Sequence, residues 1–222
     1  MIDIHSHILP GVDDGSRSVD MTKKILSAYV RQGVSQVICT PHQSSELHRP
    51  EVLQDRFSQL RSEVADYPVR LYLGAEIYYY ENIIPDLQSG RLLTLNSTEY
   101  VLVEFSTRAE MVYIPDAVYE LSIAGYKPIV AHIERYGYFS FENWEEVKSN
   151  GGLIQVNASV FEKKEYAKLV KKFLKSDLVD FIASDCHNDV SRTADFSAAK
   201  TYIEKKFPDR YEKYFGDNNF LF

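Results

Sequence analysis

The feature that most constrains the fold is a regular alternation of two kinds of segment along the chain. Short apolar runs rich in β-branched residues are followed by longer segments with apolar residues at three- and four-residue spacing. Seven such runs cover residues 2–4, 36–39, 69–73, 100–103, 128–131, 153–156 and 179–183. Strands that alternate with helices are typical of a parallel sheet. Seven repeats predict an α/β barrel related to the (β/α)8 type, with one unit missing.

Six helices are expected among these runs. The apolar spacing predicts them over residues 21–30, 52–64, 116–124, 144–148, 161–174 and 195–207. Gly33 and Gly125 follow two of them, and glycine commonly ends a helix because it adopts the left-handed conformation at little cost. No low-complexity segment, linker or internal repeat interrupts the pattern.

The chain of 222 residues, 45% of them hydrophobic, is long enough for one well-buried core. We therefore expect a single domain over residues 1–222. The formal net charge is −7, and no basic face of the kind found on nucleic-acid-binding proteins is evident, so no nucleic-acid partner is expected. The densest run of lysines, over residues 163–175, is interspersed with apolar residues and is interpreted as the wet side of an amphipathic helix.

The sequence also bears on where the protein works. No stretch approaches the ~18 apolar residues of a membrane span, so no direct membrane insertion is expected. The first residues lead into a strand and lack the basic and apolar regions of a signal peptide. Cys39 and Cys186 are the only cysteines, too few for a disulfide framework. Together these features predict a cytoplasmic protein.

Residue types that bind metals follow the predicted strands. In (β/α) barrels the functional side chains lie at the C-terminal ends of the strands. Six of the seven runs are followed within a few residues by a histidine or a carboxylate, whereas Asn157 follows the sixth. The candidates in chain order are His5, His7, Asp13, Asp14, His42, Glu76, Glu104, His132, Asp185 and His187.

The spacing within this set has a physical meaning. Residues i and i+2 of a strand point the same way, so His5 and His7 can face one ion, as can Asp185 and His187. Imidazole and carboxylate suit zinc, manganese and iron, and a carboxylate can bridge two ions. The pattern predicts a site for more than one metal ion that uses five of the six histidines; His48, in a polar loop, is left out.

A second motif points to different chemistry and is set aside. Cys186 and Arg192 satisfy the Cys-x5-Arg pattern of cysteine-dependent phosphatases. No glycine lies between them, although glycine eases the turning of backbone N–H groups towards a phosphate. Asp185 and Asp189 flank the thiol and would raise its pKa. Cys186 is therefore not expected to be a nucleophile.

The motifs around the candidate ligands resemble those of the polymerase and histidinol phosphatase (PHP) superfamily, and the resemblance covers nearly the whole chain. They are His5-Ser6-His7, Asp13-Asp14-Gly15, Thr40-Pro41-His42, Gly74-Ala75-Glu76, Glu104-Phe105, His132-Ile133-Glu134-Arg135 and Ser184-Asp185-Cys186-His187. More narrowly, the chain resembles the CpsB-like manganese-dependent protein-tyrosine phosphatases of Gram-positive capsule and exopolysaccharide loci.

The resemblance implies the PHP fold, a distorted (β/α)7 barrel, with three divalent metal ions. Manganese follows from the resemblance, while zinc, iron and magnesium are alternatives. The resemblance assigns His5, His7, Glu76 and Asp185 to one ion, Glu76, Glu104 and His132 to a second, and Asp14, His42 and His187 to a third, with Asp13 as the alternative to Asp14. The implied substrate is the phosphotyrosine-bearing tail of a membrane-associated bacterial tyrosine autokinase that regulates capsule or exopolysaccharide biosynthesis.

The implied reaction is hydrolysis of a phosphate monoester by direct attack of a hydroxide that bridges two ions. Arg135 and Arg192 are the expected catalytic and substrate-binding side chains, because a guanidinium group can hold the non-bridging oxygens. Tyr136 and Tyr138 are the expected aromatic walls for the phenol ring. No general acid is assigned, because a phenol with a pKa of about 10 leaves with little protonation.

Three alternatives remain open from the sequence alone. The first is a phosphatase for histidinol phosphate or another small phosphomonoester, with the same metal site and a different pocket. The second is a phosphodiesterase or nuclease, which the net charge of −7 disfavours. The third is a non-catalytic metal-binding scaffold that associates with the kinase. The metal, the oligomeric state, the kinase and the sign of any effect on polysaccharide output are not fixed by the sequence.

Overall fold

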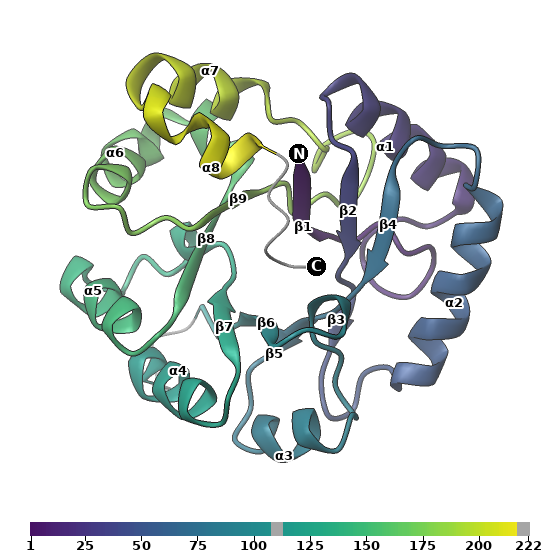
Figure 1. The fold of residues 1–222 in the computed structure, drawn as a ribbon, viewed down its shortest axis with the longest axis horizontal. Helices are drawn as coiled ribbons and strands as arrows, with labels where there is room; N and C mark the ends of the chain where they lie inside the picture. The colour runs from purple at the N-terminus through teal and green to yellow at the C-terminus, as the bar shows by residue number, and fades with distance from the viewer. Residues whose placement is uncertain (108–112, 217–222) are drawn as a thin grey trace.

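The computed structural model describes residues 1–107 and 113–216, and its strands form a ring that is surrounded by helices (Figure 1). The strands are β1 Ile2–Ser6, β2 Gln36–Cys39, β3 His42–Gln43, β4 Arg70–Leu73, β5 Glu76–Tyr78, β6 Tyr100–Glu104, β7 Lys127–Val130, β8 Leu153–Asn157 and β9 Phe181–Ala183. The helices are α1 Val19–Arg31, α2 Pro50–Glu63, α3 Ile83–Gln88, α4 Ile114–Ile123, α5 Phe141–Ser149, α6 Ala167–Lys175, α7 Ser197–Lys206 and α8 Tyr211–Phe215.

The nine strands of the described ranges make up seven barrel strands, because two of the barrel strands are each interrupted once. β2 and β3 follow one another after two residues, and so do β4 and β5. The strand order is β1-β2-β4 in one sheet and β3-β5-β6-β7-β8-β9 in the other, and every pairing is parallel. Gln36 pairs with Arg70 below the interruption and His42 pairs with Glu76 above it, so the two interrupted strands lie side by side over their whole length.

Backbone hydrogen bonds join the last strand to the first. Beyond β9, the N–H of Asp185 donates to the carbonyl of His5 at 2.9 Å, and the N–H of His7 donates to the carbonyl of Cys186 at 2.8 Å. Ser6 and Cys186 form an isolated parallel bridge. The expected distorted (β/α)7 architecture is therefore confirmed, and the joining segment contains two of the candidate ligands.

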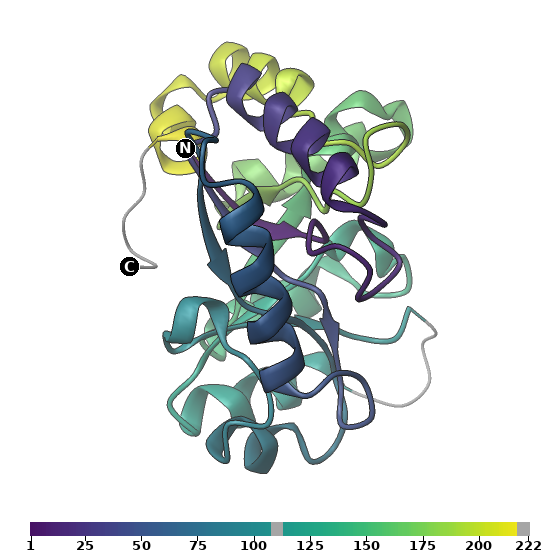
Figure 2. The ribbon, with the colours of Figure 1, turned by 90° about the vertical axis from the view of Figure 1, so that its right-hand side faces the viewer.

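Local signals account for the helix that follows β1. The Ser18 side chain accepts a hydrogen bond from the N–H of Met21 at 3.2 Å, which caps the N-terminus of α1. Beyond its C-terminus Gly33 has a φ of 74°, which glycine adopts without strain. Ile25, Leu26 and Tyr29 are buried. Figure 2 shows α1 and α2 on the outside of the strands that they cover.

The sequence prediction differs most from the structure over residues 161–174. The structure has short 3-10 segments at Ala158–Glu162 and Lys164–Tyr166, and α6 begins only at Ala167. Lys163 separates the two segments with an extended backbone, φ −100° and ψ 117°. Val160 is buried here. The helices α3 and α8, of six and five residues, were not expected because they are too short to show a helical period.

Apolar side chains fill the rest of the barrel. A cluster that includes Ile4, Ile38, Leu102 and Ile129 lies among the strands, and a larger cluster lies between the strands and the helices. No helix of the described ranges is long and apolar enough to cross a membrane. Many of the buried polar residues, among them His7, His132, Asp185 and His187, lie beyond the C-terminal ends of the strands, where a barrel carries its functional groups.

Candidate metal centre

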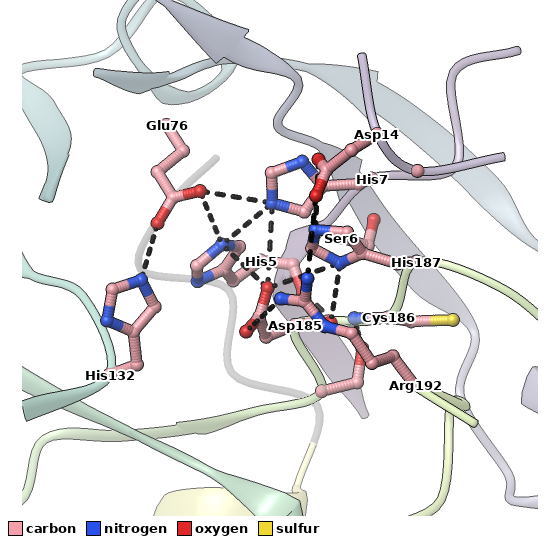
Figure 3. A network of polar contacts seen from close by, with 12 residues as sticks. His5, Ser6, His7, Asp14, Glu76, His132, Asp185, Cys186, His187 and Arg192 are labelled. Atoms are coloured by element: carbon pink, nitrogen blue, oxygen red, sulfur yellow. Dashed lines mark hydrogen bonds and ion pairs between the residues drawn. The ribbon is translucent and has the colours of Figure 1, made fainter. Parts of the chain in front are cut away.

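Glu76, the first residue of β5, lies beside three of the expected histidine ligands, His5, His7 and His132 (Figure 3). Its Oε2 lies 3.2 Å from Nε2 of His5 and 3.1 Å from Nε2 of His7. Its Oε1 lies 2.8 Å from Nε2 of His132. Both oxygens of one buried carboxylate therefore face imidazole nitrogens, as a carboxylate that bridges two ions requires.

Three histidines use one ring nitrogen to hold their orientation. Nδ1 of His5 lies 3.1 Å from the side-chain oxygen of Gln155, Nδ1 of His7 lies 2.8 Å from Asp13, and Nδ1 of His187 lies 3.0 Å from the carbonyl of Asp185. Because each partner is an acceptor, each Nδ1 donates a proton. The Nε2 lone pairs are then left for a metal ion, in the arrangement typical of histidine ligands.

The two aspartates of the loop after β1 have different positions. The Asp13 carboxylate accepts hydrogen bonds from His7 and from the N–H groups of Gly15 and His42, at 2.8 to 3.1 Å. Oδ1 of Asp14 lies 3.3 Å from Nε2 of His187 and 3.4 Å from Nε2 of His42. Asp14 is thus placed among the ring nitrogens, whereas Asp13 orients His7 from behind.

Gly15 allows this loop to turn. A Cβ atom at that position would lie 2.1 Å from the carbonyl oxygen of His7, so no other residue fits without moving the loop. The N–H of Ser16 donates to the same carbonyl at 2.8 Å. The Asp-Asp-Gly motif therefore packs directly against the strand end that carries His5 and His7.

The two oxygens of Asp185 have different environments. Oδ2 accepts hydrogen bonds from Asn157 at 2.9 Å, from Arg192 at 2.8 Å and from Arg135. Among the described residues the buried Oδ1 has no hydrogen-bond partner, and it lies 3.5 Å from Nε2 of His5 and 3.6 Å from Nε2 of His7. Asp185 thus directs one free oxygen into the cluster while the other is held by three donors.

Two candidate ligands have left-handed backbone conformations just beyond a strand end. His132 follows β7 with a φ of 34°, and Asp185 follows β9 with a φ of 52°. Non-glycine residues rarely adopt such angles, which cost about 1–3 kcal/mol and are concentrated at functional sites. The turn at each position aims a side chain at the cluster.

The crowding of charges shifts several pKa values. Burial lowers the pKa of His7, but hydrogen bonds to Asp13 and Glu76 outweigh burial and raise it to about 10. Burial, reinforced by the Glu76 carboxylate, raises the pKa of Glu104 to about 7. Burial and the neighbouring His7 lower the pKa of His187 to about 4. In the metal-free cluster, protons on some imidazoles therefore balance the negative charge of the carboxylates, as bound cations would.

The residues present fit divalent cations. Buried Nε2 of His187 and Oδ1 of Asp185 have no hydrogen-bond partner among the described residues, and bound cations would satisfy both atoms. Atoms of three overlapping sets lie within 4.8 Å of one another: His7, Asp14, His42 and His187; His5, His7 and Glu76; and His42, Glu76 and Glu104. The last set joins His42 to Glu104, whereas the resemblance pairs Glu104 with His132, whose Nε2 lies 3.4 Å from Glu104.

Two amides of β8 hold the ligands of neighbouring strands, a role that the sequence analysis missed. Oε1 of Gln155 accepts from the N–H of His132 at 2.8 Å as well as from His5. Nε2 of Gln155 donates to Asn157 at 2.8 Å, and Asn157 in turn donates to Asp185. The spacing of Gln155 and Asn157, two residues apart on the strand without a ligand, is the signal that indicates a shared inward face.

The two arginines lie at the open edge of the cluster. Both guanidinium groups contact Asp185, and their side chains are 34% and 38% exposed for Arg135 and Arg192, whereas those of His5 and His7 are fully buried. They line a cavity of about 330 Å³ together with Glu134, Asn157, Ser159, Val160, Glu162, Lys163, Tyr166, Ser184, Asp185, Ser191, Thr193 and Asp195. An anion that enters this cavity would therefore meet two cationic groups beside the candidate metal ligands.

The tyrosines expected to form the walls occupy unlike positions. Tyr136 is only 2% exposed, and its hydroxyl accepts a hydrogen bond from the N–H of Phe105 at 2.9 Å. It packs between His132 and Trp144, so the structure corrects the expectation of an open wall at this residue. Tyr138 is 40% exposed, and its hydroxyl donates to the carbonyl of Ser106.

The two residues that the sequence analysis set aside lie outside the cluster. Cys186 is buried, its thiol donates weakly to the carbonyl of Asn188 at 3.7 Å, and burial raises the pKa of the thiol. In Figure 3 its sulfur points away from the imidazoles. His48 contacts the backbone carbonyl of Val12. Neither belongs to the sets that can hold a metal ion.

Comparison with known proteins extends over nearly the whole chain. The family model for capsular polysaccharide synthesis, CpsB/CapC, matches residues 1–220. The tyrosine-protein phosphatase CpsB of Streptococcus pneumoniae is 37% identical over 93% of this chain and 91% of its own length. The tyrosine-protein phosphatase YwqE of Bacillus subtilis is 32% identical over 93% and 85%.

Solved structures give a concordant result. One from the pair YwqE of Bacillus subtilis and CpsB of Streptococcus pneumoniae, described as unique metal-dependent tyrosine phosphatases, has a TM-score of 0.88 at 30% identity and covers 93% of this chain and 87% of that one. Histidinol phosphate phosphatase from Lactococcus lactis, complexed with zinc, histidinol and phosphate, shares the fold with a TM-score of 0.55 at 14% identity, over 92% and 94% of the two chains. The chain belongs to the CpsB/CapC family of capsular polysaccharide synthesis.

Proposed function

We propose that this protein is a metal-dependent protein-tyrosine phosphatase that acts in capsule or exopolysaccharide biosynthesis. The observation that carries the proposal is the free Oδ1 of Asp185, which faces the imidazoles of His5 and His7 while the other oxygen is held by two arginines. Metal ligands and phosphate-binding groups thus meet at one carboxylate. Relatives at 37% and 32% identity are tyrosine-protein phosphatases.

The proposed ligand set has nine members and three ions, most simply manganese. His5, His7, Glu76 and Asp185 would hold the first ion, Glu76, Glu104 and His132 the second, and Asp14, His42 and His187 the third. The distances around Glu76 support its role as the residue shared by two ions. Divalent cations held by these residues supply positive charge opposite the phosphate oxygens and acidify water near neutral pH.

The other side chains position the substrate. Arg135 and Arg192 can exchange their contact with Asp185 for charge-assisted hydrogen bonds to the non-bridging phosphate oxygens. Tyr138, at the surface nearby, is the remaining candidate for contact with the phenol ring. The phenolate leaves with little protonation because its pKa is about 10, so direct hydrolysis needs no dedicated acid in the cluster.

The proposed partner is the phosphotyrosine-bearing tail of a bacterial tyrosine kinase, and the proposed location is the cytoplasm. The family links the chain to capsular polysaccharide synthesis. The absence of a membrane-spanning helix among the described residues is compatible with this location.

The proposal is tested by phosphate release from a phosphotyrosine peptide after removal of all metals and reloading with manganese, zinc or iron. We expect activity that is lost with chelator and regained with metal, and a higher kcat/KM for the peptide than for histidinol phosphate. A rapid acid quench should yield no phosphorylated enzyme. Failure to hydrolyse the peptide with any of these metals would refute the proposal.

A further inference from the structure

One helix of this acidic protein carries an unbalanced positive charge. Residues 163–175 contain six lysines and one glutamate, a formal charge of +5, whereas the whole chain carries −7. The remaining residues therefore sum to −12. This segment comprises Lys163, the 3-10 turn Lys164–Tyr166 and all of α6, which lies on the outside of the barrel near β8 and β9 (Figure 1).

Four of these lysines form one exposed row, which we call the lysine face: Lys164, Lys168, Lys171 and Lys175. The spacing of three and four residues places Lys168, Lys171 and Lys175 on one side of α6, and Lys164 precedes them in the 3-10 turn. Val170, Phe173 and Leu174 on the opposite side are buried in the core. The like charges repel one another at this spacing, so the row opposes helix stability unless an anion covers it.

The lysine face has no acidic partner within the described parts of the chain. None of its four lysines forms an ion pair there, whereas Lys24, Lys127 and Lys148 pair with Asp189, Glu99 and Asp180. The sequence interpretation of a wet helix side accounts for the exposure of the row. It does not account for the lack of ion pairs on this face in so acidic a chain.

The segment leads from the lysine face to the candidate metal centre. Lys163 and Tyr166 line the same cavity as Arg135, Asp185 and Arg192. The nine residues of α6 extend away from that cavity, over about 13 Å at 1.5 Å per residue. An extended peptide of about four or five residues spans this distance.

We propose that the lysine face is a docking surface for a negatively charged peptide segment that flanks the target phosphotyrosine. The inference rests on the proposed phosphatase function and adds a substrate preference to it. With the phosphotyrosine at Arg135 and Arg192, acidic or phosphorylated residues about five or more positions away would lie along α6. Exposed charges of this kind act mainly on association and on KM, and salt weakens them.

An anionic membrane surface is the competing occupant, and the structure favours a peptide. A helix that lies in a membrane interface exposes an apolar face. The large exposed apolar residues of the described chain all lie outside residues 163–175. The apolar side of α6 is covered by the barrel, and Lys163, next to the first lysine of the row, lines the cavity of Arg135 and Arg192.

The test uses matched phosphotyrosine peptides. One set carries four glutamates that begin about five residues from the phosphotyrosine, on the N-terminal or the C-terminal side, and the other set carries glutamines there. For the wild type at about 0.01 M salt we expect at least one glutamate peptide to have a kcat/KM about tenfold higher than its glutamine match, through KM. The ratio should approach one at about 1 M salt.

The decisive variant combines Lys164→Gln, Lys168→Gln, Lys171→Gln and Lys175→Gln, and its ratio should be close to one at low salt. The ratio is taken within one protein, so a general loss of activity cancels. The control, Lys205→Gln with Lys206→Gln on α7, removes exposed lysines elsewhere and should keep the wild-type ratio.

Three results would overturn the inference. The first is a wild-type ratio near one for glutamates on either side of the phosphotyrosine. The second is an unchanged ratio in the four-lysine variant. The third is that this variant keeps its ratio but loses binding to phosphatidylserine vesicles, measured separately. In each of these cases hydrolysis of the glutamine peptides leaves the proposed phosphatase function intact. If neither set is hydrolysed, the function fails and the docking surface with it.

Discussion

Asn157 and Asp185 are joined by a hydrogen bond of 2.9 Å from the side-chain amide to Oδ2. The bond ends a chain of amides that starts at His5 and His132 and passes through Gln155. β8 therefore contributes no candidate ligand of its own but connects ligands from β1, β7 and β9. Both amide side chains are buried, so each polar atom depends on this chain for its partner.

Replacing Asn157 with aspartate tests the value of this connection. Asn157→Asp keeps the shape but removes the donor and sets a second carboxylate against Oδ2 of Asp185. We expect metal affinity to fall about 10- to 100-fold, the usual effect of losing a residue that orients a ligand. Calorimetric titration of the metal-free protein measures it. Asn82→Asp, at an exposed position, adds the same charge and should bind metal like the wild type.

Much of the fold could be predicted from the sequence because the apolar pattern changes period at each boundary between strand and helix. Residues 36–39 were predicted as a strand and form β2. The interruptions after β2 and β4 could not be foreseen, because they depend on how two strands pair across the barrel. The division of residues 161–174 depends on tertiary packing around Val160, which overrides a continuous helical spacing.

The candidate ligands could be predicted for a related reason. Histidines and carboxylates after successive parallel strands must meet at one end of a barrel. The respective positions of Asp13 and Asp14 could not be predicted, because the turn at Gly15 decides which carboxylate faces the imidazoles. Gln155 went unnoticed because an amide within an apolar strand gives no chemical signal on its own.

The ion pair of His7 and Asp13 predicts how the stability of the metal-free protein depends on pH. The pKa of Asp13 is lowered to about 2, chiefly by His7 against the effect of burial, so its contribution is lost as the pH falls through that value. The pKa of His7 is raised to about 10, so its contribution is complete below about pH 6.5 and is lost as the pH rises through about 10.

Asp13→Asn should therefore destabilise the metal-free protein most between about pH 4 and 6.5, and less as the pH approaches 10. The expected loss at pH 6 is on the order of 1–3 kcal/mol. Urea unfolding with chelator at pH 6 and at pH 9.5 measures it, with Asp55→Asn on the exposed side of α2 as the control. An equal loss at both pH values would show that the ion pair is not the cause.

Tyr136 is expected to matter for stability. In Tyr136→Phe the buried N–H of Phe105 loses its acceptor, which should lower the free energy of unfolding by about 1–3 kcal/mol. Denaturant unfolding gives this quantity. KM for a phosphotyrosine peptide should stay at the wild-type value; a raised KM with unchanged stability would restore Tyr136 as a substrate wall.

Tyr138 is expected to show the converse behaviour, because its ring is exposed and its hydroxyl bonds only to the carbonyl of Ser106 in the described chain. Tyr138→Leu should raise KM for the peptide by about two- to tenfold through lost ring stacking. The KM for small phosphomonoesters without an aromatic ring should not change. Equal effects on both substrates would argue against contact with the phenol.

Substitutions at two neighbouring residues, Asp185 and Cys186, distinguish metal-dependent hydrolysis from catalysis by a cysteine thiol. Asp185→Asn removes an anionic oxygen that faces His5 and His7. It leaves Arg135 and Arg192 with only their longer contacts of 3.7 Å to Glu104 and Asp14. We expect kcat/KM to fall by about 100-fold or more, because the proposed metal ions lose a ligand and the two arginines proposed to bind phosphate lose their main anchor. Cys186→Ser changes a buried thiol with one weak contact, and activity should stay within about threefold of the wild type.

Alkylation tests the same distinction. Burial raises the pKa of the thiols of Cys39 and Cys186, so the folded protein at pH 8 should resist iodoacetamide until denaturant exposes them. A cysteine nucleophile would instead give an inactive Cys186→Ser variant, rapid alkylation of the folded enzyme and activity that survives chelation.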